Sequence, residues 1–411
     1  MLVGLPITNA EATPTNTTIY ASSTNPNNCC PDCGRTGTKR DHTTRTIVDV
    51  PILGFPTALV ITTPRYLCRS TSCARKIFTG GISCVEPGTK VTRRAVSWML
   101  TQLATTKSSI ASVAKSLGIS WQLANTLIMS ACQKLLDQDP HRFDHVRIIG
   151  VDEHKWKHTH KPGHPSDFVT VIVDLTPTVD GVGPARLLDV VPGRTKQVLA
   201  QWLQGRSNNF RNRVEVVTMD GFVGYASAVK QCLPDAVTIM DPFHVVQLCG
   251  EKLQACRRRL QQQLVGRRGR KDDVLYKNRR LLLTRRGLLS SKAYARLEQL
   301  WQAREEHVAL QILWEVYQRV IAAYEEKCPA RGKKLMMQVL ELIHTAVPEG
   351  LEELAQLGRS LWRRRADIVA YFKVRASNGP VEAINGRLEF LRGVALGFRR
   401  SWSLCVAVFV A

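Results

Sequence analysis

Long apolar runs are absent from this chain, since no segment reaches the roughly 18 consecutive apolar residues that a membrane-spanning helix needs. The N-terminus also lacks the basic stretch followed by an apolar stretch that marks a secretory signal peptide. We therefore expect a cytoplasmic protein without a membrane partner. Its twelve cysteines are then reduced thiols or metal ligands rather than disulfides.

Acidic residues are few compared with basic ones. Lys and Arg number 57 against 34 Asp and Glu, which gives a formal net charge of +23. Such an excess favours a polyanionic partner, and we expect double-stranded DNA and association with the nucleoid. The 411 residues are enough for two or three domains, each with its own core.

The N-terminal region predicts a tail followed by a metal site. Residues 1–28 are rich in Thr, Asn, Pro and Ser without any period, which is typical of a flexible tail. Two pairs of cysteines follow, and together they offer the four thiolates of a structural, tetrahedral zinc site: Cys30, Cys33, Cys68 and Cys73.

Strand patterns at 46–50 and 57–63 lie between the two cysteine pairs, so we predict a zinc ribbon over residues 29–84. Spacing alone leaves open whether Cys29 or Cys30 is the ligand, and Cys84 is a possible substitute. Free thiols that cluster by chance are the alternative.

Residues 91–137 have a helical period and predict a helix-turn-helix domain that binds DNA. Val113 and Leu117 belong to an apolar stripe, Gly118 follows at the turn, and a helix begins at Trp121. The first turns of a recognition helix contact base edges, so the predicted DNA-binding residues there are Trp121, Gln122 and Asn125. A small helical bundle without DNA contacts is the alternative.

Three strand patterns run directly into an acid: 147–152 into Asp152, 214–220 into Asp220, and 236–241 into Asp241. One such acid usually caps a helix or a turn. Three of them favour carboxylates gathered at one edge of a sheet, where metal ligands can meet. We interpret Asp152 as the first ligand of a metal site.

Strands are predicted at 146–151, 168–175, 186–191, 214–219 and 236–240, with helices at 195–204 and 222–232. This order is that of a ribonuclease H-like α/β core over residues 145–245, in which the first and fourth strands are neighbours. Asp152 and Asp220 should then lie side by side.

Strand patterns disappear between 246 and 376, which predicts an all-helical insertion. Its basic run includes Arg267, Arg268 and Arg270, which either form a solvated loop or contact phosphates. The core resumes over 377–411 with a helix whose first turn holds Glu382. That carboxylate is either a further metal ligand or simply stabilised by the helix dipole.

Several of these motifs together resemble one known family. They are Asp152-Glu153, Thr218-Met219-Asp220, Asp241-Pro242-Phe243-His244, Ser377-Asn378-Gly379-Pro380-Val381-Glu382 and Leu391-Arg392-Gly393. The chain resembles, over about residues 29 to 400, bacterial insertion-sequence transposases with an Asp-Asp-Glu site, of the ISL-three lineage. After Phe398-Arg399 it departs from the family, because an apolar run over 404–411 replaces a basic helix.

The resemblance implies a catalytic triad of Asp152, Asp220 and Glu382 with two Mg²⁺ (or Mn²⁺) ions per active site, which suits in-line phosphoryl transfer. Asp241 and His244 match a motif near the active site without an assigned role. The partners implied are the terminal inverted repeats and target DNA, bound by a homo-oligomer. The rival hypotheses are a non-catalytic zinc-containing DNA-binding regulator and a ribonuclease H-like nuclease that does not join strands.

Overall fold

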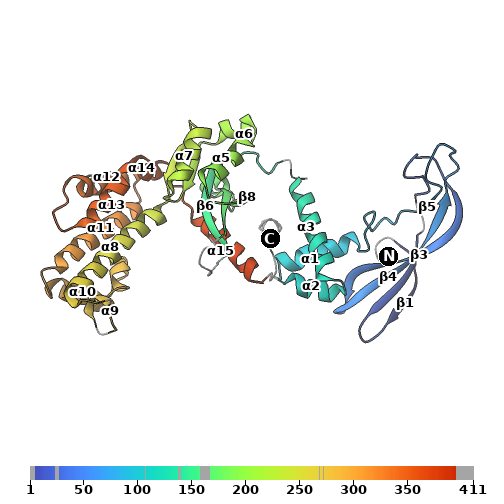
Figure 1. Cartoon of the computed structure of the whole chain (residues 1–411), viewed down its shortest axis with the longest axis horizontal. Coiled ribbons are helices and arrows are strands. Elements are labelled where there is room, and N and C mark those ends of the chain that lie inside the picture. Colours follow the sequence, from blue (N-terminus) through green and yellow to red (C-terminus); the bar gives the residue numbers. More distant parts are fainter. Residues whose placement is uncertain are drawn as a thin grey trace. The chain divides into compact units, whose positions relative to one another are not determined.

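The computed structural model of the chain describes residues 5–23, 27–106, 108–137, 139, 141–157, 167–267, 269–271 and 273–394. Two compact units make up the protein (Figure 1). One consists of residues 1–142 and 387–411, and the other of residues 143–386. Arg268 and the apolar run at 404–411 lie outside the described residues.

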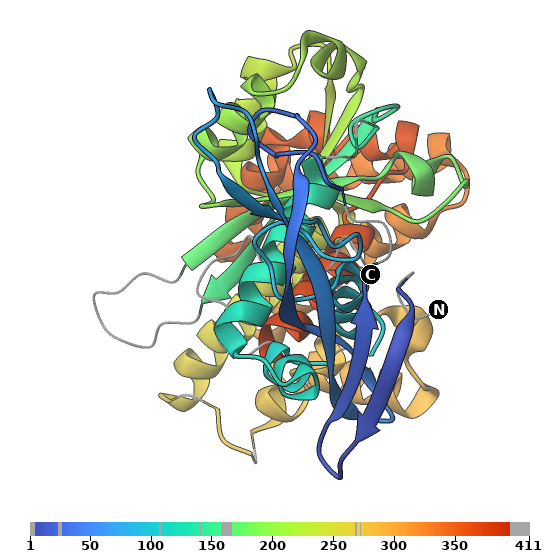
Figure 2. The ribbon, with the colours of Figure 1, turned by 90° about the vertical axis from the view of Figure 1, so that its right-hand side faces the viewer.

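A five-stranded sheet forms much of the first unit. Its main path is β1 (Ile7–Ala12), β2 (Thr17–Ser22), β4 (Phe55–Leu67) and β3 (Thr38–Ile52), and β5 (Ile77–Thr79) pairs with β4. The blue strands lie side by side in Figure 2. Both strands predicted between the cysteine pairs are confirmed, and both are longer than predicted because their polar ends pair with each other in the antiparallel β3–β4 ladder.

The flexible tail expected over residues 1–28 is wrong for most of its length. β1 and β2 form an antiparallel pair, and β2 lies parallel to β4 with Ile19 and Ala21 buried. Pairing with β4 stabilises a short segment whose composition alone favours disorder, since strand formation depends strongly on the neighbouring strand.

Three helices follow the sheet in this unit: α1 (Arg93–Ala104), α2 (Ile110–Leu117) and α3 (Trp121–Asp137). They match the helices predicted over 91–137. Ser109 caps α2 by accepting from the backbone N–H of Ser112, and Gly118 ends it in the left-handed conformation with φ 65°. Ile110, Val113 and Leu117 are buried in the core that the three helices share.

A buried carboxylate joins the first sheet to its helices. Asp49 in β3 is fully buried, accepts a hydrogen bond from Thr92 Oγ1 at 2.7 Å, and pairs with the Arg94 guanidinium. Thr92 is also the N-cap of α1, so one acid fixes where that helix starts. No local pattern in the sequence indicates these interactions, which join residues 43 and 45 positions apart.

The second unit is built on another five-stranded sheet, of order β10-β9-β6-β7-β8. Its strands are β6 (Ile148–Lys157), β7 (Asp167–Asp174), β8 (Arg186–Pro192), β9 (Val216–Met219) and β10 (Val237–Met240). β6, β9 and β10 are parallel, while β7 and β8 run antiparallel to their neighbours. All five predicted strands are confirmed, and the first and fourth of them are neighbours as expected.

Helices connect and cover this sheet: α4 (Thr176–Val179), α5 (Lys196–Gln204), α6 (Asn208–Arg213) and α7 (Val223–Cys232). The helices predicted at 195–204 and 222–232 correspond to α5 and α7. Leu199, Leu203 and Val229 pack with Ile149 and Val217 of the central strands in one buried core.

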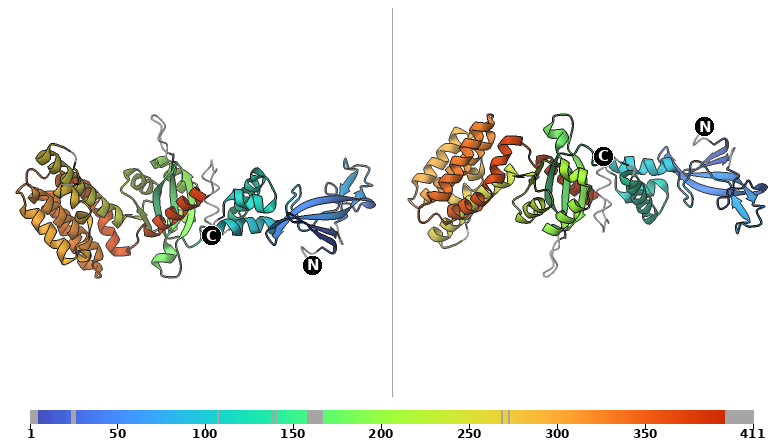
Figure 3. Two further views of the ribbon diagram at one scale, coloured as in Figure 1. Left: turned by 90° about the horizontal axis from the view of Figure 1, so that it is seen from below. Right: turned by 90° about the horizontal axis from the view of Figure 1, so that it is seen from above.

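From the end of β10 to residue 376, the described residues form helices joined by loops, without a strand. These elements are α8 (Pro242–Val265), α9 (Val274–Lys277), the 3₁₀ turns η1 (Leu281–Leu283) and η2 (Arg286–Leu288), α10 (Ser291–Gln302), α11 (His307–Glu325), α12 (Pro329–Thr345), α13 (Glu352–Arg363) and α14 (Arg365–Val374). These helices gather in one bundle beside the sheet (Figure 3). Trp314, 1% exposed, lies in its core.

The final described helix, α15 (Gly379–Val394), begins in the second unit and carries Glu382 in its first turn. Among the helices of the described ranges, none combines the length and the apolar character needed to cross a membrane.

Candidate active site and metal centres

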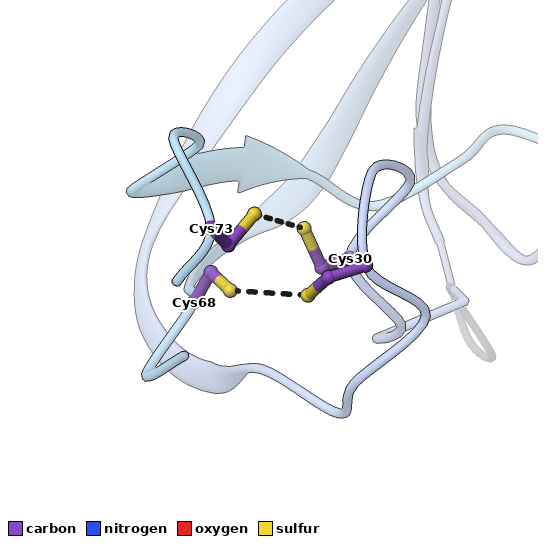
Figure 4. Close-up of side chains that lie close together, drawn as sticks. Cys30, Cys68 and Cys73 are labelled. Atoms are coloured by element: carbon purple, nitrogen blue, oxygen red, sulfur yellow. Dashed lines mark hydrogen bonds between the residues drawn. The ribbon is translucent and has the colours of Figure 1, made fainter. Parts of the chain in front are cut away.

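Four cysteines of the first unit meet in one group: Cys30, Cys33, Cys68 and Cys73. Their sulfur atoms all lie within 4.8 Å of one another, and Cys33 Sγ is 3.6 Å from Cys68 Sγ. Figure 4 shows Cys30, Cys68 and Cys73 pointing toward one another, with Cys30 Sγ 3.9 Å from Cys73 Sγ. Zn–S bonds of about 2.3 Å in a tetrahedron require sulfur atoms about 3.8 Å apart. The spacing therefore fits one zinc ion held by four thiolates.

Tight turns bring these sulfurs together. Gly34 adopts φ 72°, a conformation that favours glycine, and its N–H bonds to the Cys30 carbonyl at 2.8 Å. Arg75 pairs with Asp32 at 2.9 Å, which links the two cysteine turns. Cys29, which is exposed, and Cys84 are not members of the group. The structure therefore favours Cys30 over Cys29 as the fourth thiolate, a choice that spacing alone left open.

A second cluster lies in the other unit. One carboxylate oxygen each of Asp152 and Asp220 and one ring nitrogen of His244 all lie within 4.8 Å of one another. Asp152 is 7% exposed and Asp220 is 8% exposed, so both acids are buried but reachable. Two carboxylates and an imidazole at this spacing are a donor set that fits a divalent cation.

Strand pairing brings the two acids together. Val151 of β6 lies opposite Met219, the last residue of the parallel strand β9, so Asp152 and Asp220 follow at neighbouring positions. Asp152 is not at the exit of its strand as expected, because β6 continues to Lys157 by pairing with β7. Asp152 thus comes from a continuous strand, and Asp220 from the point where β9 ends.

Hydrogen bonds hold both carboxylates in place. The backbone N–H of Phe222 donates to Asp220 Oδ1 at 2.9 Å, which is an Asx turn at the end of β9. Asp152 Oδ1 accepts from the N–H of Glu153 at 2.9 Å, and Asp152 Oδ2 accepts from Asn385 Nδ2 at 2.8 Å. Each acid keeps lone pairs for a cation, since a carboxylate has about four acceptor positions.

Asn378 connects the strands beneath the site. It is fully buried, its Nδ2 donates to the Val151 carbonyl at 2.9 Å, and its Oδ1 accepts from the Thr218 hydroxyl. Its own N–H donates to Asp241 Oδ1 at 2.7 Å. The sequence indicated Asn378 only as a member of the motif that ends at Glu382. A buried amide bonded to three segments instead fixes β6, β9 and the start of α8 relative to one another.

The structure leaves Glu382 outside the group of mutual ligand atoms. It lies in the first turn of α15, where its N–H bonds to the Asn378 carbonyl at 2.9 Å. Its charge still acts on Asp152, whose pKa it helps to raise. The role of Glu382 as third member of a catalytic triad stays a prediction.

Burial dominates the electrostatics of the acidic cluster. Loss of hydration raises the pKa of Asp152 to about 7, with Asp220 and Glu382 acting in the same direction and His244 opposing it. Burial raises the pKa of Asp220 and of Glu382 as well. Closely spaced carboxylates that resist ionisation by themselves are stabilised as anions when a cation binds between them.

The predicted DNA-binding residues have different surroundings. Gln122 at the start of α3 is exposed, whereas Trp121 packs on the core of α1–α3. Asn125 is partly buried, and its Oδ1 has no hydrogen-bond partner among the described residues. Arg267 and Arg270 are exposed after α8.

Comparison with known proteins establishes the class of this chain. A family model described as a transposase, of the ISL3 type, matches residues 149–408, and one for the zinc finger of the IS204/IS1001/IS1096/IS1165 transposases matches residues 26–73. The first match covers more than half of the chain, so the chain belongs to the ISL3 transposase family. The resemblance drawn from its sequence is thereby confirmed.

Two relatives are similar over most of their lengths. The transposase for insertion sequence element IS1001 of Bordetella parapertussis is 22% identical over 383 residues, which are 93% of this chain and 88% of the relative. The transposase for IS1557 of Mycobacterium tuberculosis is 25% identical over 331 residues, 75% of this chain and 68% of the relative. A solved pre-cleavage Mos1 transpososome shares 15% identity over 62% of this chain and 81% of that one, with a TM-score of 0.15, too low to inform the fold.

Family membership makes this protein a transposase, and it implies activity in cleaving DNA and transferring its strands. The zinc-finger match and the four-cysteine group together indicate a structural zinc site. Sequence reasoning missed the hydrogen bonds of Asn378 and Asn385, and it placed His244 near the active site without a role. Asn378 and His244 had a signal only as members of quoted motifs, and Asn385 had none, because a single amide or imidazole side chain forms no periodic pattern.

Proposed function

We propose that this transposase cleaves and joins DNA strands at the site of Asp152 and Asp220, and that these acids hold the divalent cations of the reaction. One observation carries the proposal: Asp152 lies in β6, Asp220 directly follows its parallel neighbour β9, and the two carboxylates have oxygens within 4.8 Å of each other. Glu382 is the proposed third acid of the triad.

The order of strands supports a ribonuclease H-like core. Across the sheet the strands follow the order β10, β9, β6, β7, β8, which are the fifth, fourth, first, second and third along the chain. The pairs β6–β7 and β7–β8 are antiparallel. Helices α8 to α14 then form an insertion between the last strand, β10, and the helix that carries Glu382. This arrangement supports the proposed core with its helical insertion.

Divalent cations such as Mg²⁺ or Mn²⁺, two per site, supply activation of the attacking oxygen and stabilisation of the leaving oxygen. The residues of the chain position them. Asp152 is fixed by Asn385 and by its own strand, and Asp220 by the Asx turn at Phe222. Carboxylates held in this way meet the cation without a reorganisation cost at the moment of reaction.

The N-terminal unit is the proposed reader of the element's terminal repeats. The α2–turn–α3 segment has the cap, the left-handed Gly118 and the exposed Gln122 that a helix-turn-helix motif requires. Because two ends of an element must be handled together, we propose a homo-oligomer on DNA. Mass measurement of the complex with terminal-repeat duplexes tests that part.

Two alternatives predict different products. A regulator without catalysis needs only the N-terminal unit, and it leaves the paired acids of the second unit without a role. A nuclease that only hydrolyses would use the acids but would not join a 3′-hydroxyl end to target DNA.

The test is a strand-cleavage and strand-transfer assay with labelled terminal repeats and Mg²⁺. We expect Asp220→Asn to bind the repeats as the wild type does and to reduce nicking by about a hundred- to a thousandfold, because the amide has the same size but no anionic oxygen. Asp235→Asn, at an exposed acid before β10, is the matched control and should keep full activity.

A second substrate separates the alternatives. A pre-cleaved end with a free 3′-hydroxyl should be joined to target DNA by the wild type. Hydrolysis without joining would favour the nuclease, and nicking by Asp220→Asn at the wild-type rate would reject the assignment of the acids.

A further inference from the structure

His244 has no task in the function proposed above, yet it lies against both acids. A ring nitrogen of His244 is within 4.8 Å of ligand oxygens of Asp152 and Asp220, whereas Glu382 is not a member of that group. His244 stands in the first turn of α8, three residues after Asp241, and its side chain is 24% exposed.

We propose that His244 is itself a ligand of the active-site cation through Nε2, and that Asp241 is the positioning residue that orients its ring. This inference rests on the proposed function, because it presupposes that Asp152 and Asp220 bind the cation. It assigns roles to the first and the last residue of the Asp241-Pro242-Phe243-His244 motif.

The surroundings of Asp241 support a fixed ring orientation. Asp241 is 1% exposed, and its Oδ1 accepts from the Asn378 N–H at 2.7 Å. Its Oδ2 accepts from the Phe243 N–H at 3.1 Å and lies 3.3 Å from His244 Nδ1. A carboxylate held on both oxygens cannot turn away from the imidazole.

A carboxylate bonded to one ring nitrogen determines the function of the other. When Nδ1 carries the proton and donates a hydrogen bond to Asp241, Nε2 keeps a lone pair and can bind a metal ion. Metal-binding histidines very commonly have such a carboxylate partner, which also makes the ligand more basic. The backbone supports the same geometry, since the Asp241 N–H donates to the Met219 carbonyl at 2.8 Å beside Asp220.

The competing role is that of a positive charge. Burial lowers the pKa of His244, but the hydrogen bond to Asp241 and the charges of Asp152 and Asp220 raise this pKa by more, so the net effect is a rise. A protonated imidazole would neutralise the acids by charge alone and would have no lone pair for a cation. The two roles are separated by whether a bound cation contacts a nitrogen atom.

A nitrogen ligand also changes the choice of cation. Sites made only of carboxylates suit Mg²⁺, whereas an imidazole ligand increases the affinity for transition-metal ions. Among the divalent first-row transition metals Mn²⁺ gains the least, but it still gains relative to Mg²⁺. We expect Mn²⁺ to bind more tightly than Mg²⁺ to the wild type. Removing the imidazole should weaken Mn²⁺ binding by about 10- to 100-fold, with a smaller effect on Mg²⁺.

The experiment uses the full chain and Mn²⁺ as the probe, without DNA. Electron paramagnetic resonance gives the affinity from the signal of free Mn²⁺, and electron spin-echo envelope modulation detects a directly bound ¹⁴N nucleus. The variants are His244→Asn, whose amide can keep the bond to Asp241 but lacks Nε2, and Asp220→Asn. His42→Asn, at an exposed histidine of the other unit, is the control.

We expect ¹⁴N modulation in the wild type and in His42→Asn, none in His244→Asn, and weak Mn²⁺ binding in Asp220→Asn. Mn²⁺ binding that depends on Asp220 but shows no ¹⁴N modulation overturns the role of His244 and leaves the acidic site standing. Modulation that persists in His244→Asn also overturns it. If the wild type shows no Mn²⁺ binding that depends on Asp220, the proposed function fails together with this inference.

Discussion

At the scale of single residues, Gly150 shows how closely two elements of the active site approach. A Cβ atom at this position of β6 would lie 2.6 Å from Val381 Cγ2 and 2.9 Å from Leu175 Cδ1. Only a residue without a side chain lets the first turn of α15, which carries Glu382, pack on the strand that carries Asp152. Gly150 is therefore needed for space rather than for its backbone freedom.

Gly150→Ala should move the start of α15 or strain β6. We expect the free energy of opening of β6, measured by hydrogen exchange of its amides, to fall by about 1 to 3 kcal/mol, as is typical of overpacked cores. Nicking should fall with it, because Asn378 and Glu382 lie at the displaced end of the helix.

Gly386→Ala is the matched control in the same helix. A Cβ there meets no atom within 4 Å, so the substitution should leave exchange in β6 and nicking unchanged. Equal protection of β6 in the two variants would contradict the packing argument.

At the scale of elements, the two cysteine turns depend on a metal rather than on a large apolar core. The apolar cluster around them comprises Tyr66 and Phe78, stacked at 5.5 Å, and three of the cysteines themselves. So small a core contributes little to the free energy of unfolding. Zinc binding supplies folding free energy instead, because it joins two cysteine turns that are far apart in the chain.

Cys33→Ser should therefore release its zinc and loosen the two turns and β5, while the second unit stays folded. Cys29→Ser should keep one zinc per chain, because Cys29 is exposed and lies outside the thiolate group. Metal analysis of both purified variants gives the zinc content, and hydrogen exchange locates the loosened segment. Zinc retained by Cys33→Ser, or released by Cys29→Ser, would reassign the ligands.

At the scale of the whole molecule, the excess of positive charge is shared by two units that we expect to bind DNA differently. In the first, the exposed Gln122 at the start of α3 is the candidate for base contact, and partly buried Asn125 is less accessible. In the second, Arg267 and Arg270 are exposed at the end of α8. Base contacts carry sequence information, whereas phosphate contacts carry affinity that depends on salt.

Gln122→Ala should reduce the preference for terminal-repeat over random duplexes by about 1 to 3 kcal/mol and leave the salt dependence unchanged. The double variant Arg267→Ala and Arg270→Ala should do the reverse, lowering the slope of log affinity against log salt by about 0.9 for each phosphate that it no longer neutralises. Binding isotherms at several salt concentrations measure both effects. An equal fall in preference in both variants would refute this division.

The sequence by itself determined the family, the order of the elements and the residues that can hold metals. Strands followed by acids and cysteines in pairs are local patterns, so the five strands of the second sheet and the candidate zinc thiolates Cys33, Cys68 and Cys73 could be predicted from them, whereas only the fold distinguished Cys30 from Cys29. Local composition failed at residues 1–28, where β2 is stabilised by a partner that starts 33 positions beyond its own end.

Tertiary structure alone decided which side chains meet. His244 reaches Asp152 and Asp220, and Asn378 joins Val151 and Thr218, across separations of up to 227 residues. No local pattern encodes such interactions, because hydrogen bonds and ligand distances depend on where the chain returns after a long helical region. The chemistry of each residue can be read from the chain, but its partners exist only in the fold.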